Sequence, residues 1–291
     1  MVINELIKLG VEELKDREFS NPMLETRLIL AKLLNVDKSF VYAYGEKEVS
    51  GEVADKFIMM IKQRSKGYPF QYLMNEKEFM GLDFYIEEGV LVPRADTEIL
   101  VEYVIDYINE EYKDQNIKVL DLGIGSGAIS LSIANRFPNI LVYGVDIDSI
   151  PIRVANINKK RFNLSNVEFL MGDMFEPIEK IGAKKVFQII ASNPPYIPKD
   201  EIEKLQDEVK TYEPRLALDG GDDGLKFYRE ITSKSREYLV ENGLLIYEIG
   251  FNQANDVKSI LIQEGFKDIK ILKDLQGLDR VVLGFSEIKG K

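Results

Sequence analysis

After residue 117 the chain alternates short apolar runs with longer segments of helical periodicity, and this alternation constrains its fold more than any other feature. Seven runs have strand character: residues 118–122, 141–146, 167–172, 186–192, 243–249, 269–272 and 280–285. The first five are separated by stretches long enough for the helical crossovers that parallel strands need. Only a short turn separates the last two, which is typical of an antiparallel hairpin. The pattern therefore predicts an α/β fold around a seven-stranded sheet, mostly parallel with one reversed strand.

The residues before this region are organised differently. Apolar residues recur at helical spacing, and Asn21 followed by Pro22 is typical of a capped helix start. Two short strand-like runs then follow at 78–80 and 82–86, with glycines beside them. We therefore predict a small helical domain at 1–69, a β-hairpin linker at 70–93 and an α/β domain at 94–291.

The chain contains no Cys and no His, which excludes disulfides and thiolate metal sites. It also lacks the commonest metal ligand and the commonest general base, so we expect no metal site. The net charge is −11, and neither side of Pro93 carries an excess of basic residues, which argues against tight binding of free DNA or RNA. The first residues are typical of an amphipathic helix rather than a secretory signal, and no apolar run approaches about 18 residues. We therefore expect a cytoplasmic protein without a membrane partner.

Three glycines directly follow the first predicted strand, in the sequence Gly123-Ile124-Gly125-Ser126-Gly127. Their spacing allows a ligand to approach the backbone closely. It differs from the G-x-G-x-x-G of dinucleotide folds, and no G-K-[ST] is present to hold a triphosphate. A plain strand-to-helix turn is the alternative for a glycine triplet alone.

Acidic residues end the next two strands. Asp146 ends the second strand, where a carboxylate can accept hydrogen bonds from two ribose hydroxyls. Asp173 and Met174 follow the third strand and offer a carboxylate and an apolar surface to an adenine ring. Carboxyl ends of parallel strands meet at one edge of a sheet, so these residues predict a nucleoside site, although both acids are also common as loop caps.

Asn193-Pro194-Pro195-Tyr196 follows the fourth strand and is the most specific motif of the chain. Two prolines stiffen the backbone and remove two N–H donors, which leaves the Pro194 carbonyl available as an acceptor. The Asn193 side-chain oxygen is a second acceptor at the same edge. The motif resembles the N-P-P-Y of methyltransferases that act on planar nitrogens, in adenine or in amides.

These features resemble the class I, Rossmann-like methyltransferases, and the resemblance covers residues 95–286. It implies S-adenosylmethionine as cofactor, with S-adenosylhomocysteine as product. The residues expected at the cofactor are Gly123, Ile124, Gly125, Ser126, Gly127, Asp146, Asp173, Met174 and Asn193.

Further blocks resemble one family over nearly the whole chain: the release-factor glutamine methyltransferases of the HemK/PrmC type. They are 69–73, 92–98, 121–128, 193–197, 212–218 and 220–225. The resemblance implies that the chain methylates the glutamine amide of the Gly-Gly-Gln motif in class I peptide chain release factors and that the helical domain docks this substrate. Asn193, Pro194 and Tyr196 would be catalytic and, with Pro195, would bind the substrate. Ala95 and Ile124 depart from the usual proline and threonine of the family, outside the expected chemistry.

Other functions remain open from the motifs alone. A ribosomal-protein glutamine methyltransferase would share the core motifs, and a DNA or RNA adenine methyltransferase would use the same tetrapeptide on a flipped base. The acidic charge disfavours the nucleic-acid enzyme. A cofactor-binding protein without activity is the third alternative, which the intact N-P-P-Y motif disfavours.

Overall fold

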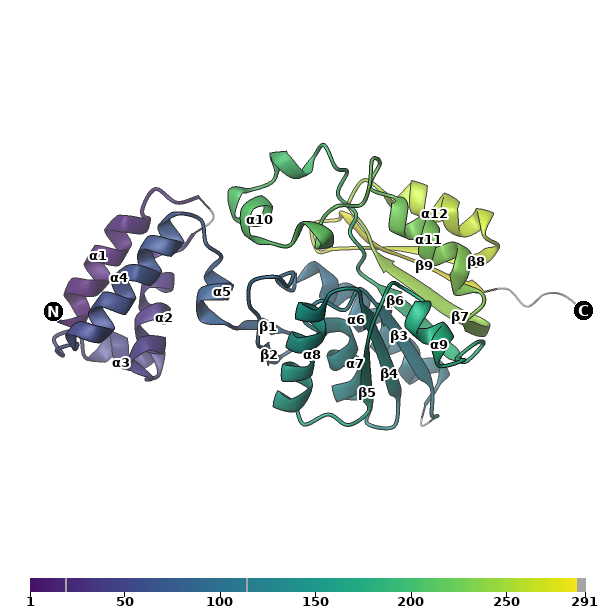
Figure 1. Cartoon of the computed structure of the whole chain (residues 1–291), viewed down its shortest axis with the longest axis horizontal. Helices are drawn as coiled ribbons and strands as arrows, with labels where there is room; N and C mark the ends of the chain where they lie inside the picture. Colours follow the sequence, from purple (N-terminus) through teal and green to yellow (C-terminus); the bar gives the residue numbers. More distant parts are fainter. Residues whose placement is uncertain (19, 114, 287–291) are drawn as a thin grey trace, which may run out of the picture. The chain divides into compact units, whose positions relative to one another are not determined.

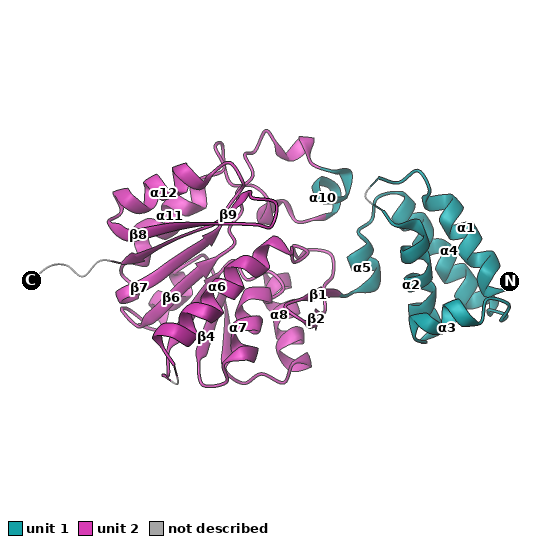
Figure 2. Ribbon diagram, turned by 180° about the vertical axis from the view of Figure 1, so that it is seen from behind, with its two compact units in different colours: residues 1–76, 206–212 teal, residues 77–205, 213–291 magenta. Residues whose placement is uncertain are grey.

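The structure is a computed structural model that describes residues 1–18, 20–113 and 115–286. It divides the chain into two compact units, coloured teal and magenta in Figure 2. The first contains residues 1–76 and 206–212, and the second contains the intervening residues together with those from Glu213 onward. Within the described residues, no helix is long and apolar enough to span a membrane.

The first unit is helical. Its helices are α1 (Ile3–Leu14), α2 (Pro22–Leu34), α3 (Lys38–Ala43), α4 (Gly51–Ser65), α5 (Phe70–Met74) and α10 (Asp207–Tyr212). Asn21 caps α2, because its side-chain oxygen accepts a hydrogen bond from the Leu24 amide at 3.1 Å, and Pro22 begins the helix. This confirms the helix start predicted from the two residues.

A buried arginine holds α10 in this unit. Arg64 on α4 is 2% exposed, and its guanidinium contacts Glu25 of α2 at 2.7 Å and Glu208 of α10 at 2.6 Å. The Tyr212 ring also packs edge-on against Tyr68, with 5.2 Å between ring centroids. A short segment from the middle of the sequence therefore completes the helical unit.

The second unit contains a seven-stranded sheet, visible in Figure 1. Its strands are β3 (Lys118–Leu122), β4 (Leu141–Asp146), β5 (Val167–Met171), β6 (Phe187–Ser192), β7 (Leu239–Glu248), β8 (Phe266–Lys273) and β9 (Asp279–Ser286). Their order is β5-β4-β3-β6-β7-β9-β8, and only β9 runs antiparallel to its neighbours. The predicted α/β sheet with one reversed strand is confirmed.

Helices cover both faces of this sheet (Figure 1). One face carries α6 (Asp96–Glu111), α7 (Ala128–Arg136) and α8 (Ser149–Arg161), and the other carries α9 (Glu176–Lys180), α11 (Lys226–Ser235) and α12 (Ala254–Gln263). Side chains alternate along a strand, so Val119 of β3 joins the core under α6 and α7 while Leu120 joins the core under α11 and α12. The central strands are thus buried on both faces, as parallel strands usually are.

A hairpin of β1 (Lys77–Phe79) and β2 (Leu82–Phe84) precedes the sheet. Met80 and Gly81 form its turn with φ values of 52° and 73°, the left-handed conformation of a two-residue hairpin turn. Phe79 and Phe84 are fully buried in the core beneath α6. Two 3-10 turns, Ile202–Lys204 and Arg215–Ala217, lie in the loop that follows β6.

Candidate active site

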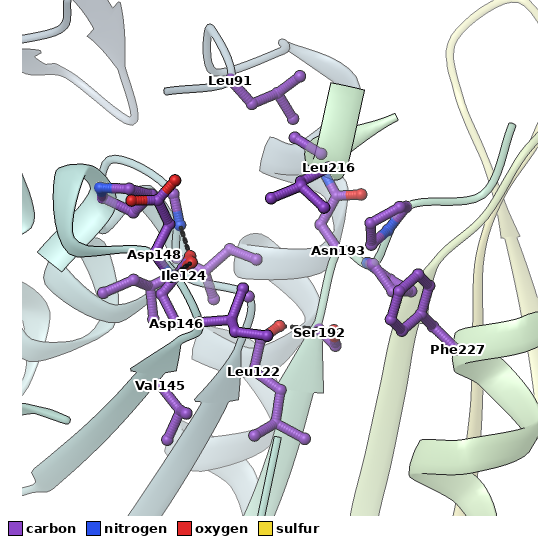
Figure 3. A pocket seen from close by; sticks show the side chains of 18 of the residues that line it. Leu91, Leu122, Ile124, Val145, Asp146, Asp148, Ser192, Asn193, Leu216 and Phe227 are labelled. Carbon is purple, nitrogen blue, oxygen red and sulfur yellow. Dashed lines mark hydrogen bonds between the residues drawn. The ribbon is translucent and has the colours of Figure 1, made fainter. Parts of the chain in front are cut away.

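A cavity of about 440 Å³ lies at the carboxyl ends of β3, β4, β5 and β6. This volume is within the range of small-molecule sites, and the sheet edge is where ligands of such folds bind. Figure 3 shows that Asp146 and Asp148 come from one side of the cavity and Asn193 and Phe227 from the other. All residues expected at the cofactor line the cavity except Gly127, which is absent from the described lining.

The glycine loop leaves open space on its cavity side. Gly123 and Gly125 have φ values of 78° and 54°, which other residues adopt only with strain. A Cβ built on Gly123 would find its nearest atom, the Asn193 carbonyl oxygen, 4.0 Å away, and one on Gly125 would lie 3.9 Å from Val90. The space beside these two residues is therefore available to a ligand.

Gly127 has a different reason to be glycine. A Cβ there would lie 2.9 Å from the Leu131 side chain and 3.2 Å from that of Ala155, at a φ of 83°. The residue is buried at the start of α7. Its small size allows α7 to pack closely. The spacing of glycines in the sequence cannot distinguish this packing role from contact with a ligand.

Asp146 supports the glycine loop as well as facing the cavity. Its Oδ2 accepts a hydrogen bond from the Gly125 amide at 3.0 Å, and its Oδ1 accepts one from the Asp148 amide at 3.1 Å (Figure 3). Burial raises the pKa of the Asp146 carboxyl above its ordinary value, while these backbone hydrogen bonds oppose the rise. Each oxygen retains a second lone pair, so the carboxylate can still accept from a ligand.

Asp173 and Met174 lie beyond the end of β5, and both line the cavity. Met174 has a φ of 43°, and its side chain packs against the core beneath α11. Four carboxylates line the cavity, those of Asp146, Asp148, Asp173 and Glu230, against the two basic side chains of Arg94 and Lys226. This excess of negative charge suits a cationic ligand and disfavours a phosphate.

The tetrapeptide Asn193–Tyr196 begins where β6 ends. Asn193, Pro194 and Pro195 line the cavity, whereas Tyr196 is not among the lining residues in the described part of the chain. The Tyr196 ring packs against the core beneath α11, and its backbone carbonyl accepts a hydrogen bond from the Gln253 side chain at 2.9 Å.

Two polar residues that sequence reasoning did not single out surround Asn193. Its side-chain nitrogen contacts the Thr97 hydroxyl at 3.3 Å, and that hydroxyl contacts the Glu248 carboxylate. The Tyr196 hydroxyl lies 3.5 Å from the other Glu248 oxygen. The sequence signal for Glu248 is an acidic residue that interrupts the apolar segment 244–249.

Glu248 is a buried carboxyl, 2% exposed. Its pKa is raised to about 7, chiefly by burial and also by the nearby Asp96. The hydrogen bond from Thr97 and the charges of Arg280 and Arg94 oppose this rise. Burial likewise raises the pKa of Tyr196. No cluster of three or more Asp or Glu residues in the described ranges could hold a metal ion.

Comparisons with known proteins identify relatives over nearly the whole chain. A family model described as the PrmC N-terminal domain matches residues 5–74, and a methyltransferase domain model matches residues 113–247. A protein named release factor glutamine methyltransferase from Clostridium acetobutylicum is 45% identical over 97% of this chain and 98% of its own length. One of the same name from Fusobacterium nucleatum is 42% identical over 99% of this chain and 80% of its own.

Among solved structures, the hMettl16 catalytic domain in complex with the MAT2A 3'UTR hairpin 1 is similar in fold. It superposes with a TM-score of 0.59 at 14% identity, covering 89% of this chain and 91% of that one. At that identity the likeness concerns the arrangement of strands and helices alone.

Proposed function

Because this chain belongs to the family of release factor glutamine methyltransferases, we propose that it methylates the side-chain amide of the glutamine in the Gly-Gly-Gln motif of class I release factors. The observation that carries the proposal is the Asn193 amide at the rim of the cavity, held by two prolines beside an open glycine loop. Release factors act during translation, so we place the reaction in the cytoplasm.

S-adenosylmethionine fits the residues that line the cavity. Gly123 and Gly125 leave room for its methionine portion, and Asp146 has acceptor positions for the ribose hydroxyls. Asp173 and Met174 offer a carboxylate and an apolar surface to the adenine. When bound, the cofactor supplies an electrophilic methyl group on a sulfonium, a cation that the surrounding carboxylates favour. S-adenosylhomocysteine is then the product.

The protein contributes positioning rather than a strong base. An amide nitrogen is a weak nucleophile because its lone pair is delocalised, and the chain has no His to deprotonate it. The Asn193 side-chain oxygen and the Pro194 carbonyl accept the two amide hydrogens and orient the nitrogen. The same two dipoles stabilise the positive charge that develops on nitrogen as the methyl group is transferred. The proton leaves to water afterwards.

For Tyr196, which is outside the described lining of the cavity, we propose contact with the flat face of the substrate amide, because the residue directly follows Pro194 and Pro195, which do line it. Its hydroxyl is already engaged with Glu248, which limits the positions of the ring. The helical unit is the proposed docking module for the release factor.

A methyl-transfer assay tests the function. We expect the enzyme, given S-adenosylmethionine and the release factor of its own source, to label one glutamine, identified by mass spectrometry, and to leave a Gly-Gly-Ala factor unlabelled. Asn193→Ala should reduce turnover roughly 100- to 1000-fold while cofactor binding persists. Labelling of a ribosomal protein or of DNA in place of the factor would assign one of the alternative functions.

A further inference from the structure

The side chain of Asn193 belongs to a chain of hydrogen bonds that ends at a buried carboxylate. Asn193 Nδ2 lies 3.3 Å from the hydroxyl of Thr97, in the first turn of α6, and this hydroxyl contacts Oε2 of Glu248 at the end of β7. Thr97 and Glu248 are 4% and 2% exposed, so water does not compete for these contacts. Three separate elements thus meet behind the tetrapeptide.

The hydrogens that these groups carry set the direction of the hydrogen bonds. An ionised carboxylate only accepts hydrogen bonds, so the single hydroxyl proton of Thr97 points to Glu248. The Thr97 oxygen is then an acceptor and takes a hydrogen from the Asn193 amino group. The two ends of an asparagine amide have nearly the same shape, and only their hydrogen-bond partners distinguish them. Anchoring the nitrogen leaves the oxygen of Asn193 for the cavity.

We propose that Thr97 and Glu248 are positioning residues that make Asn193 present an oxygen, and not an amino group, to the nitrogen that is methylated. The inference rests on the proposed function, in which Asn193 accepts an amide hydrogen of the substrate. An Asn193 turned the other way would direct its own N–H groups at the substrate N–H groups, and neither could accept.

Charged groups from several elements face Glu248. Asp96 lies on α6 beside Thr97, Arg280 comes from β9, and Arg94 precedes α6. The Tyr196 hydroxyl faces the carboxylate from the tetrapeptide, and the Tyr228 hydroxyl of α11 donates to the Glu248 backbone carbonyl at 3.0 Å. In this setting the pKa of Glu248 is raised to about 7, chiefly by burial.

Protonation of Glu248 reverses the direction of these hydrogen bonds. The protonated carboxyl donates to the Thr97 oxygen, whose own proton is released to donate to Asn193, and the amide turns its oxygen away from the substrate. The active form is therefore the ionised one. Turnover should rise with pH through about 7 and fall below it, because the folded-state pKa marks where the proton is taken up.

Single-turnover rates of three variants test the proposal. Thr97→Val keeps the volume but removes the hydroxyl, and we expect turnover to fall roughly 10- to 100-fold with little change in KM for the release factor or in cofactor affinity. Thr97→Ser restores the hydroxyl and should restore turnover. Glu248→Gln keeps an acceptor that does not titrate, so its rate should lose the pH dependence near 7. Thermal unfolding shows whether each variant is folded.

An NMR measurement separates this inference from the proposed function. In protein labelled with ¹⁵N-asparagine, the Asn193 side-chain amide, assigned by its absence in Asn193→Ser, should shift with a midpoint near pH 7, and Thr97→Val or Glu248→Gln should abolish the shift. No methyl acceptor is needed. A wild-type enzyme that leaves release factor unmodified would overturn the function alone. Turnover at the wild-type rate in folded Thr97→Val would overturn the positioning role. An Asn193 amide signal whose pH-dependent shift persists in Glu248→Gln would overturn it as well.

Discussion

Replacing Asp146 with Ala should weaken cofactor binding by about 3 kcal/mol. In the structure one lone pair of Oδ2 is used by the Gly125 amide and one of Oδ1 by the Asp148 amide. The remaining lone pair on each oxygen can accept one ribose hydroxyl. Hydrogen bonds to a charged acceptor contribute roughly 1.5 to 3 kcal/mol each, and the lower figure applies because Asp146 is only half-buried. Two such bonds correspond to a dissociation constant roughly 150-fold higher.

Calorimetric titration with S-adenosylmethionine measures this change. Asp146→Asn should be intermediate, because it keeps one acceptor oxygen but presents an amino group to a backbone N–H. Asp83→Ala, which removes an exposed carboxylate on β2 outside the cavity lining, is the matched control and should bind normally. Binding should also weaken on acidification, starting above the ordinary range of an aspartate, since burial raises the pKa of Asp146. An unchanged dissociation constant in folded Asp146→Ala would refute its place at the ribose.

Two further predictions concern the glycine loop and the helical unit. Gly123→Ala should weaken cofactor binding in calorimetry and lower the unfolding temperature only by the strain of a side chain at its positive φ, because its Cβ enters open space. Gly127→Ala carries the same strain and also brings its Cβ to 2.9 Å from Leu131, so its unfolding temperature should fall further; equal effects of the two on binding would contradict the assignment. Arg64→Ala leaves Glu25 buried without its ion-pair partner and should lower the free energy of unfolding of the helical unit by roughly 3 to 5 kcal/mol in denaturant titration. The control Lys56→Ala breaks only an exposed ion pair and should lower it by about 0.5 kcal/mol or less. Equal stability of the Arg64 and Lys56 variants would show that the buried pair contributes nothing.

Most of the fold was predictable because its signals are local. The predicted strands 118–122 and 141–146 agree with β3 and β4 residue for residue, since most residues of these two buried parallel strands are apolar and Gly123 and Asp146 mark their ends. The hairpin before the sheet was less accurate: its strands are Lys77–Phe79 and Leu82–Phe84, and the linker predicted at 70–93 begins with the helix Phe70–Met74. Short elements carry too few residues for periodicity to locate their ends.

Local sequence patterns were enough to predict the sheet, the edge of the sheet where the cavity lies, and the tetrapeptide beside it, because strand ends and motifs depend on neighbours in the chain. The residues that support them become visible in the folded chain. Thr97 and Glu248 are 151 residues apart, and Arg64 and Glu208 are 144 apart, so no local pattern connects either pair. Likewise, Gly123 faces open space while Gly127 faces packed side chains. The distinction depends on what lies beyond a missing Cβ, which is a property of the folded chain alone.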